Sequence, residues 1–185
     1  MDIREAIYGR RAVRDYVRKP IEQSVIKSLI DAAIQAPSAV NQQPWTFTVV
    51  RDERILDQLS RESKVHMLEF HPGVRESEHF QMLNDPHFQI FYHAPVLILI
   101  SAVAPVPWFV EDCSLAAQNL MLAAFDRQLG SCWIGFAQGY LNTVEGKALL
   151  GLDPSCAPVA PIIIGEPNGE SKAVARKEPQ IRWIG

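Results

Sequence analysis

The stretch 109–129 constrains the fold of this chain more than any other part of the sequence. It predicts one long helix, and between residues 113 and 125 its polar side chains are Ser114, Gln118 and Asn119. A helix that is apolar nearly all round has to be buried on every side. Because the chain has 185 residues, we expect this helix at the centre of a small protein, shared with a second subunit.

Hydrophobic spacing and helix-breaking residues predict the elements around this helix. Pro20 opens a helix that Pro37 stops, because proline cannot continue a helix. Residues 64–94 have a mixed pattern that predicts no element. The other expected elements are helices at 2–9, 51–63 and near 143–150, and strands at 46–50, 96–101, 131–135 and 159–165.

Length and charge limit the domain organisation and the partners. A chain of this length suits a single domain, 1–185. The net charge of -3 argues against nucleic acid or an anionic membrane as a partner. The most apolar run, 94–108, is cut by prolines and falls short of the roughly 20 residues that a membrane span requires. We therefore expect no nucleic acid and no membrane among the partners.

The cysteines and the N-terminus indicate the compartment. Cys113, Cys132 and Cys156 are widely spaced and form no CxxC pair, so we expect reduced thiols rather than disulfides. The opening run MDIREAIYGRR has no apolar signal core. Both features predict a cytoplasmic protein.

Basic residues gather in the segment RRAVRDYVRK, residues 10–19. For Arg18 and Lys19 a solvated helix end is a sufficient explanation, because cations favour that end of the helix dipole. Arg10 falls on the apolar face of the preceding helix if that helix continues. An arginine drawn toward a core needs an anion, and a phosphomonoester offers oxygens for forked guanidinium bonds. The segment is therefore a candidate phosphate site.

The run QAPSAVNQQPW, residues 35–45, holds more carboxamides than an ordinary turn requires. A carboxamide presents a donor and an acceptor in one plane, so Asn41 and Gln43 suit a ligand whose edge alternates acceptors and donors. The alternative is a plain connection between a helix and a strand. We favour that alternative for Trp45, in the core, and for Gln42, facing solvent.

Motifs for side-chain catalysis or for a metal are absent from the sequence. The run LGSCWIGFAQG has scattered glycines but no GxGxxG, and no P-loop, nucleophile elbow or zinc spacing occurs. The histidines fall at intervals of 5, 8, 8 and 6, which fit neither HxxxH nor HExxH, so we expect no metal. They are His66, His71, His79, His87 and His93. The surrounding segment, 64–94, is rich in aromatic residues and predicts a cover over a flat ligand, or else a surface helical insert.

Five segments together resemble the FMN-dependent nitroreductase family, whose members are NAD(P)H-dependent flavin oxidoreductases. In order they are RRAVRDY, APSAVNQQPW, DCSLAAQNLMLAA with LGSCWIGF, PIIIGEP, and ARKEP. The match covers nearly the whole chain. One segment alone is a weak signal, but the order and spacing of all five are specific.

The resemblance implies an α+β fold in which a mixed, mainly antiparallel sheet is flanked by helices. It also implies an interlocked homodimer with two FMN sites at the subunit interface. Residues 64–94 would form a lid that contacts the substrate. Residues 166–185 would form an arm that wraps the partner subunit, and the apolar residues of its last run, IRWIG, need a surface to cover.

The resemblance also implies which residues hold FMN. Arg10, Arg11 and Ala12 would meet the phosphate and the ribityl chain, and Arg14 would lie toward the N1 and O2 side of the flavin. Ala12 stands where the family often has serine, so a hydroxyl contact is missing, although the backbone amide can still serve.

Three other segments would supply the remaining FMN contacts. From the partner subunit would come Pro37, Ser38, Asn41 and Gln43. The ring would be bordered by Trp133, Ile134, Gly135, Gly165 and Glu166. In the tail Arg176 would return to the phosphate, with Lys177 as the near alternative.

The function that the resemblance implies is reduction of nitroaromatics, quinones or similar electron-poor compounds by ping-pong turnover. NADH or NADPH would react first and a small-molecule oxidant second. The flavin performs this chemistry, so no side chain need be catalytic. The alternatives are another flavin reaction on the same fold, such as dehalogenation or enone reduction, a flavin-binding module without turnover, and a purely structural homodimer.

Overall fold

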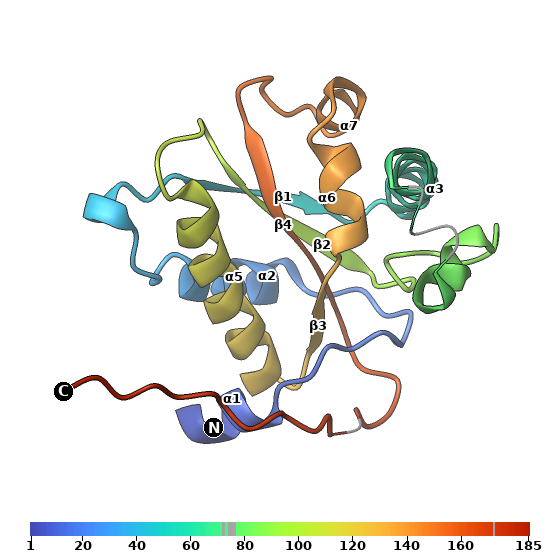
Figure 1. Cartoon of the computed structure of the whole chain (residues 1–185). Helices are drawn as coiled ribbons and strands as arrows, with labels where there is room; N and C mark the ends of the chain where they lie inside the picture. The colour runs from blue at the N-terminus through green and yellow to red at the C-terminus, as the bar shows by residue number, and fades with distance from the viewer. Residues whose placement is uncertain (72, 74–76, 172) are drawn as a thin grey trace.

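Four strands form one antiparallel sheet in the computed structural model, which describes residues 1–185 except 72, 74–76 and 172 (Figure 1). The sheet order is β1-β2-β4-β3. The bounds are β1 (Trp45–Val50), β2 (Val96–Ala102), β3 (Gly130–Trp133) and β4 (Ala157–Gly165). A parallel pairing occurs as an isolated bridge between Ala12 and Ser131. The prediction of a mainly antiparallel sheet in an α+β fold is confirmed.

Helices cover both faces of this sheet. On one face lie α2 (Gln23–Ala33) and α5 (Phe109–Asp126), and on the other α3 (Glu53–Phe70) and α6 (Gly135–Leu141) (Figure 1). Successive side chains of a strand point to opposite faces. In β2, Ile98 packs in the core that contains α2 and α5, and Leu99 packs in the core that contains α3 and α6. A strand buried on both faces accounts for the continuous apolar run at 96–101.

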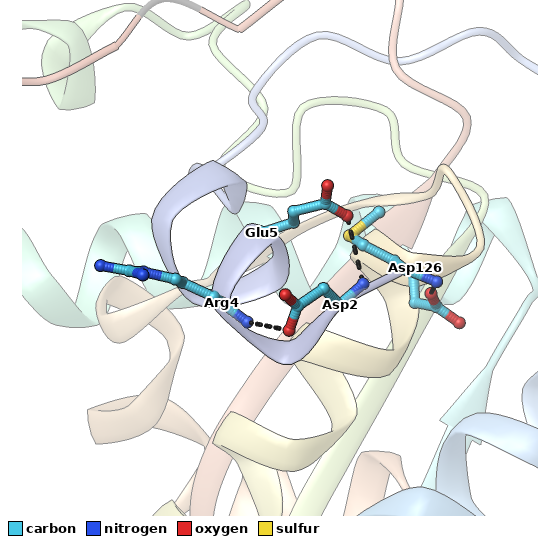
Figure 2. Close-up of polar contacts among 5 residues, drawn as sticks. Asp2, Arg4, Glu5 and Asp126 are labelled. Carbon is cyan, nitrogen blue, oxygen red and sulfur yellow. Dashed lines mark hydrogen bonds and ion pairs between the residues drawn. The ribbon is translucent and has the colours of Figure 1, made fainter.

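The short helix α1 (Ile3–Gly9) is capped at its N-terminus and attached to the end of α5. Asp2 Oδ1 accepts from the Arg4 amide at 3.1 Å, and Glu5 Oε2 accepts from the Asp2 amide at 3.1 Å (Figure 2). The N-terminal ammonium lies 3.0 Å from Asp126. A Cβ at Gly9 would lie 2.6 Å from the Phe125 ring. These contacts fix the point at which the basic segment leaves α1.

The central helix α5 begins where the sequence predicts and ends three residues earlier. Its inner side chains are fully buried, among them Ala116 and Leu120. Its outer face is not covered within one chain, because Val110 and Leu115 remain 46% and 45% exposed. Burial on every side would require a second subunit.

Helix α3 and the strand expected at 131–135 also differ from the sequence-based expectation. Helix α3 continues to Phe70 instead of ending near residue 63; its last turns contain Met67, half-buried, and Phe70, exposed, so they lack a clear apolar stripe. The strand expected at 131–135 ends at Trp133, and Gly135 begins α6, which was not predicted. Helix α6 is short and contains Gly139, whose Cβ would lie 2.9 Å from the His66 ring. Close packing on α3 therefore stabilises α6, whose own helix propensity is low.

The remaining elements are short. They are η1 (Ala39–Asn41), η2 (Glu78–Asn84) and α7 (Val144–Leu149), and α7 matches the helix expected near 143–150. In the part of the chain that the structure describes, no helix is long and apolar enough to cross a membrane. The last residues follow β4 as an extended tail that leaves the body beside α1 (Figure 1).

Candidate functional site

The basic segment lies between β3 and the chain that follows β4. The Val13 amide donates to the Ser131 carbonyl at 3.0 Å, and the Val17 amide donates to the Glu166 carbonyl at 2.9 Å. Three segments that are far apart in the sequence therefore meet here: residues 10–17, 130–135 and 165–168. All three contain residues that the sequence analysis assigned to one site.

Two glycines allow this close approach. A Cβ at Gly130 would lie 2.7 Å from the Cβ of Val13, and a Cβ at Gly165 would lie 2.6 Å from the Tyr16 ring. The Tyr16 hydroxyl donates to the Val13 carbonyl at 2.7 Å, so the ring cannot simply swing away. The glycines therefore fix the height of the basic segment above the sheet.

On one side of the basic segment is a cavity of about 280 Å³, here called the Arg14 cavity. Its lining residues are Arg14, Met67, Tyr92, Cys132, Trp133, Ile134, Gly135 and Phe136. A Cβ at Gly135 would meet no atom within 4 Å, so the backbone there is open to a ligand. The cavity is mainly apolar with one guanidinium, which suits a flat ring with a polar edge.

A second cavity, of about 300 Å³ and here called the Arg10 cavity, also adjoins the basic segment; Arg10, Arg11, Gly130, Glu170 and Ser171 help to line it. Burial is the main cause that lowers the pKa of Arg10; the charges of Arg176 and Arg11 lower it further, against Cys132. Positive charge that is partly desolvated and close to like charge is stabilised by an anion. The two arginines of the Arg10 cavity give it the chemistry of a phosphate site; Arg176 of the tail lies near enough to lower the pKa of Arg10 but is not among the described residues that line the cavity.

Arg11 lines the Arg10 cavity and also caps α1, and Ala12 forms a backbone bridge to Ser131. Arg11 Nη1 donates to the Tyr8 carbonyl at 2.7 Å and to the Arg10 carbonyl at 2.8 Å, so this guanidinium caps the end of α1. Its Nε is buried and finds no partner among the described residues. Arg10 itself follows the last helical residue, so the helix does not continue through it, yet Arg10 is half-buried.

The carboxamide loop is strained and internally bonded. Val40, Asn41 and Gln43 have positive φ of 45°, 58° and 48°, which costs roughly 1–3 kcal/mol each. Gln43 Nε2 donates to Asn41 Oδ1 at 2.9 Å, and the Gln43 amide donates to Ser38 Oγ at 2.9 Å. Trp45 is buried and Gln42 is exposed, as the sequence predicts.

The loop does not reach either cavity of its own chain. Within the described residues, the linings of the Arg10 and Arg14 cavities include none of Pro37, Ser38, Asn41 and Gln43. The loop is anchored elsewhere, because the Ala39 amide donates at 2.9 Å to Oδ1 of Asp112, which is 3% exposed. A site that used both the loop and the cavities would have to be assembled from two chains.

Glu166 and Lys177 also lie apart from the cavities. The Glu166 carboxylate accepts from Lys19 Nζ at 2.8 Å, and this hydrogen bond raises the pKa of Lys19. Gly165 contacts Tyr16 rather than lining the Arg14 cavity. Lys177 is exposed in the tail.

A larger hollow of about 400 Å³ lies between α3 and the loop before α2, and several of its charged side chains have polar partners. Arg18 lies 3.7 Å from Glu53, and Asp57 accepts from Gln89 at 3.3 Å. It touches none of the three segments that meet at β3. We therefore do not place the site there.

Sequence reasoning missed several residues around the site. Met67, Tyr92 and Phe136 line the Arg14 cavity, and Asp112 anchors the carboxamide loop. The aromatic richness of 64–94 predicted a cover but could not single out Tyr92. Within the described residues no three His, Cys, Asp or Glu side chains gather as metal ligands.

A buried lysine holds the last part of the segment 64–94 against α3. Lys64 Nζ donates to the carbonyls of Asp85, Pro86 and Phe88 at 3.0, 3.3 and 2.6 Å. Burial lowers the pKa of Lys64, against the charge of Asp85. Residues 72 and 74–76 of the expected lid lie outside the described residues.

Replacing Lys64 with methionine is expected to destabilise the protein by roughly 1–3 kcal/mol, because carbonyls that lose their donor keep their desolvation cost. Chemical denaturation measures this change. Lys147→Met is the matched control, since Lys147 donates to one exposed carbonyl, that of Pro154, at 2.7 Å, and its loss should stay within about 0.5 kcal/mol. Equal effects of the two substitutions would contradict a special role of Lys64.

Comparisons with known proteins agree in pointing to one family. The sequence model of the Nitroreductase family matches residues 7–166. A protein of Methanothermobacter thermautotrophicus, provisionally named NADH dehydrogenase/NAD(P)H nitroreductase, is 34% identical over 172 residues, which cover 90% of this chain and 78% of that protein. An iodotyrosine deiodinase of Thermotoga neapolitana is 32% identical over 127 residues, 66% of this chain and 67% of that protein. The crystal structure of a nitroreductase with bound FMN from Bacteroides fragilis superimposes with a TM-score of 0.84 at 25% identity, covering 100% of both chains.

Proposed function

The chain belongs to the nitroreductase family, and on that premise we propose that it is an FMN-dependent oxidoreductase that uses NAD(P)H to reduce electron-poor compounds. One observation carries the proposal. The basic segment contributes Arg10 and Arg11 to a cavity of about 300 Å³, which Glu170 also lines, and it contributes Arg14 to a mainly apolar cavity of about 280 Å³. These two hollows match the two ends of FMN, a phosphomonoester and a flat ring. The FMN-bound relative with the same fold supports this reading.

The residues divide between the two ends of the cofactor. Arg10, which lines the Arg10 cavity, would hold the phosphate, and Arg176, whose charge lowers the pKa of Arg10, would join it. Arg14 would meet the polar edge of the ring, and the open backbone at Gly135 would border it. FMN supplies the hydride chemistry when bound, while the protein binds and orients it.

We propose that the functional unit is a homodimer in which each chain completes the other's site. As far as the described residues go, the carboxamide loop lines neither cavity of its own chain, so Asn41 and Gln43 would serve the ring edge of the partner's flavin. Apolar side chains that one chain leaves uncovered support the interface. They are Ile3 and Ile7 of α1, Val110 and Leu115 of α5, and Ile181, Trp183 and Ile184 of the tail.

The residues that cover the Arg14 cavity would exclude water and choose the substrate. Met67 and Phe136 contribute apolar surface to it. Phe136 also packs edge-on against Phe80 of η2, with ring centroids 5.8 Å apart. An apolar wall of this kind favours flat aromatic or quinonoid substrates over small polar ones.

Reductive dehalogenation is the second candidate function. A relative named iodotyrosine deiodinase covers two thirds of this chain. The same cofactor would serve, and the difference would lie in the residues that cover the Arg14 cavity. A nitroaromatic, a quinone and a halogenated phenol should therefore be compared as oxidants.

Anaerobic titration is the test of this proposal. Purified protein reconstituted with FMN should be yellow, and NADH or NADPH should bleach it within seconds to minutes. Colour should then return on adding one of the three oxidants, and the oxidant that restores it fastest identifies the reaction. Bound flavin that neither nicotinamide bleaches would indicate a binding module, and protein that takes up no FMN would refute the proposal.

A further inference from the structure

Tyr92 is held in a strained backbone conformation at the edge of the Arg14 cavity. Tyr92 and the following His93 both have a φ of 53°, in the left-handed region that non-glycine residues rarely adopt. Such strain persists only where the surrounding structure fixes it. Strain of this kind clusters at functional sites, and this favours a functional role for the position of the Tyr92 side chain.

The contacts around Tyr92 fix its position firmly. Its amide donates to the Gln89 carbonyl at 2.9 Å. The two preceding residues, Ile90 and Phe91, are fully buried. The Tyr92 ring packs edge-on against Phe88, with centroids 5.5 Å apart at 79°. A rigid turn therefore presents the phenol to the cavity.

Arg14 lines the same cavity as this phenol. Burial raises the pKa of Tyr92, and the Arg14 guanidinium opposes that rise. Burial likewise raises the pKa of Cys132, and Arg14 and Arg10 oppose it. All of Arg14, Tyr92 and Cys132 line the same cavity. Tyr92 is therefore a neutral phenol at pH 7, and its oxygen can accept from the guanidinium.

The arginine needs such a partner. An exposed arginine has many rotamers, and freezing them costs entropy. Arg14 is exposed, and the described residues offer it no carboxylate within salt-bridge distance. A phenol fixed by a rigid turn and lining the same cavity limits where the guanidinium can lie.

We propose that Tyr92 is a positioning residue: its phenol holds the Arg14 guanidinium at the Arg14 cavity and thereby sets how strongly the site prefers reduced over oxidised FMN. This inference rests on the proposed function. A fixed cation at the polar edge of the ring stabilises the cofactor form that carries more negative charge there. A cation that moves out into solvent is screened, and it therefore stabilises that form of the cofactor less.

The test measures FMN affinity in both redox states for Tyr92→Phe, with Tyr140→Phe as the matched control. Tyr140 is half-buried on α6 beside His66 and is absent from the cavity lining, as far as the described residues go. Tyr92→Phe should lower the preference for reduced FMN about threefold to tenfold, and tenfold corresponds to about 30 mV for a two-electron couple. Tyr140→Phe should leave the preference unchanged.

The same substitution in an Arg14→Met background separates positioning from direct contact. If Tyr92 acts through Arg14, its hydroxyl should make less than a twofold difference there, and melting temperatures confirm that each variant is folded. An equal effect in both backgrounds would overturn the proposal, and so would an unchanged preference in Tyr92→Phe. If wild-type protein binds no FMN at all, the proposed function fails first, and that outcome is distinct from both.

Discussion

Replacing Arg10 with alanine is expected to weaken FMN binding by about tenfold to a hundredfold, because a hydrogen bond to a charged group contributes roughly 1.5–3 kcal/mol. Arg10 is half-buried, and its pKa is lowered by burial and by the charges of Arg176 and Arg11. The cation is therefore partly desolvated before any anion arrives. A phosphate would supply the missing counter-charge.

Titration of apoprotein with FMN, followed by flavin fluorescence, measures this loss. Arg10→Lys should be intermediate, because lysine keeps the charge but loses the planar fork. Arg18→Ala is the matched control, since that side chain is 70% exposed and lies near Glu53. Removing Arg10 should not lower the melting temperature of apoprotein, whereas the rise on adding FMN should shrink. Unchanged affinity would remove Arg10 from the phosphate site.

Deleting residues 171–185 is expected to break the dimer and release the flavin. Ile181, Trp183 and Ile184 are 63%, 87% and 84% exposed in one chain, and burying each against a partner would contribute roughly 1.5–3 kcal/mol. We expect the dimer dissociation constant to rise by at least about a hundredfold, which corresponds to about 3 kcal/mol. Analytical ultracentrifugation measures the dissociation, and absorbance at the flavin band measures the retained cofactor.

Two point variants separate the roles of the tail. Arg176→Ala should lower FMN affinity and leave the dimer intact, because its charge acts on Arg10. Trp183→Ala should weaken the dimer first. A truncated protein that stays dimeric and fully loaded with FMN would refute the arm that wraps the partner.

The main elements could be predicted from the sequence because each has a strong local signal. The apolar run of α5, the continuous strand β2 and the prolines around α2 are examples. Helix α6 could not be predicted, because Gly135 and Gly139 give it a poor helix propensity and packing on α3 stabilises it. The end of α3 was missed because Val65 and Phe70 are exposed and blur its amphipathic pattern.

The site was predictable only in part, because several of its contacts join residues that are distant in the sequence. The basic segment and the glycines beside β3 carry recognisable motifs. The bond from the Ala39 amide to Asp112 spans 73 positions, and no local pattern reveals it. Tyr92 enters the Arg14 cavity through a left-handed turn, which its aromatic neighbours gave no reason to expect.

Helix α5 is attached at both ends to parts of the proposed machinery. Asp112 in its first turn holds the carboxamide loop, and Phe125 in its last turn borders the Arg10 cavity. Its 18 residues span about 27 Å at the usual rise of an α-helix. In the proposed dimer, helix α5 would therefore contact the phosphate end of its own FMN site and the carboxamide loop that serves the partner's site. Any coupling between the two sites through this helix would have to be equal in both directions.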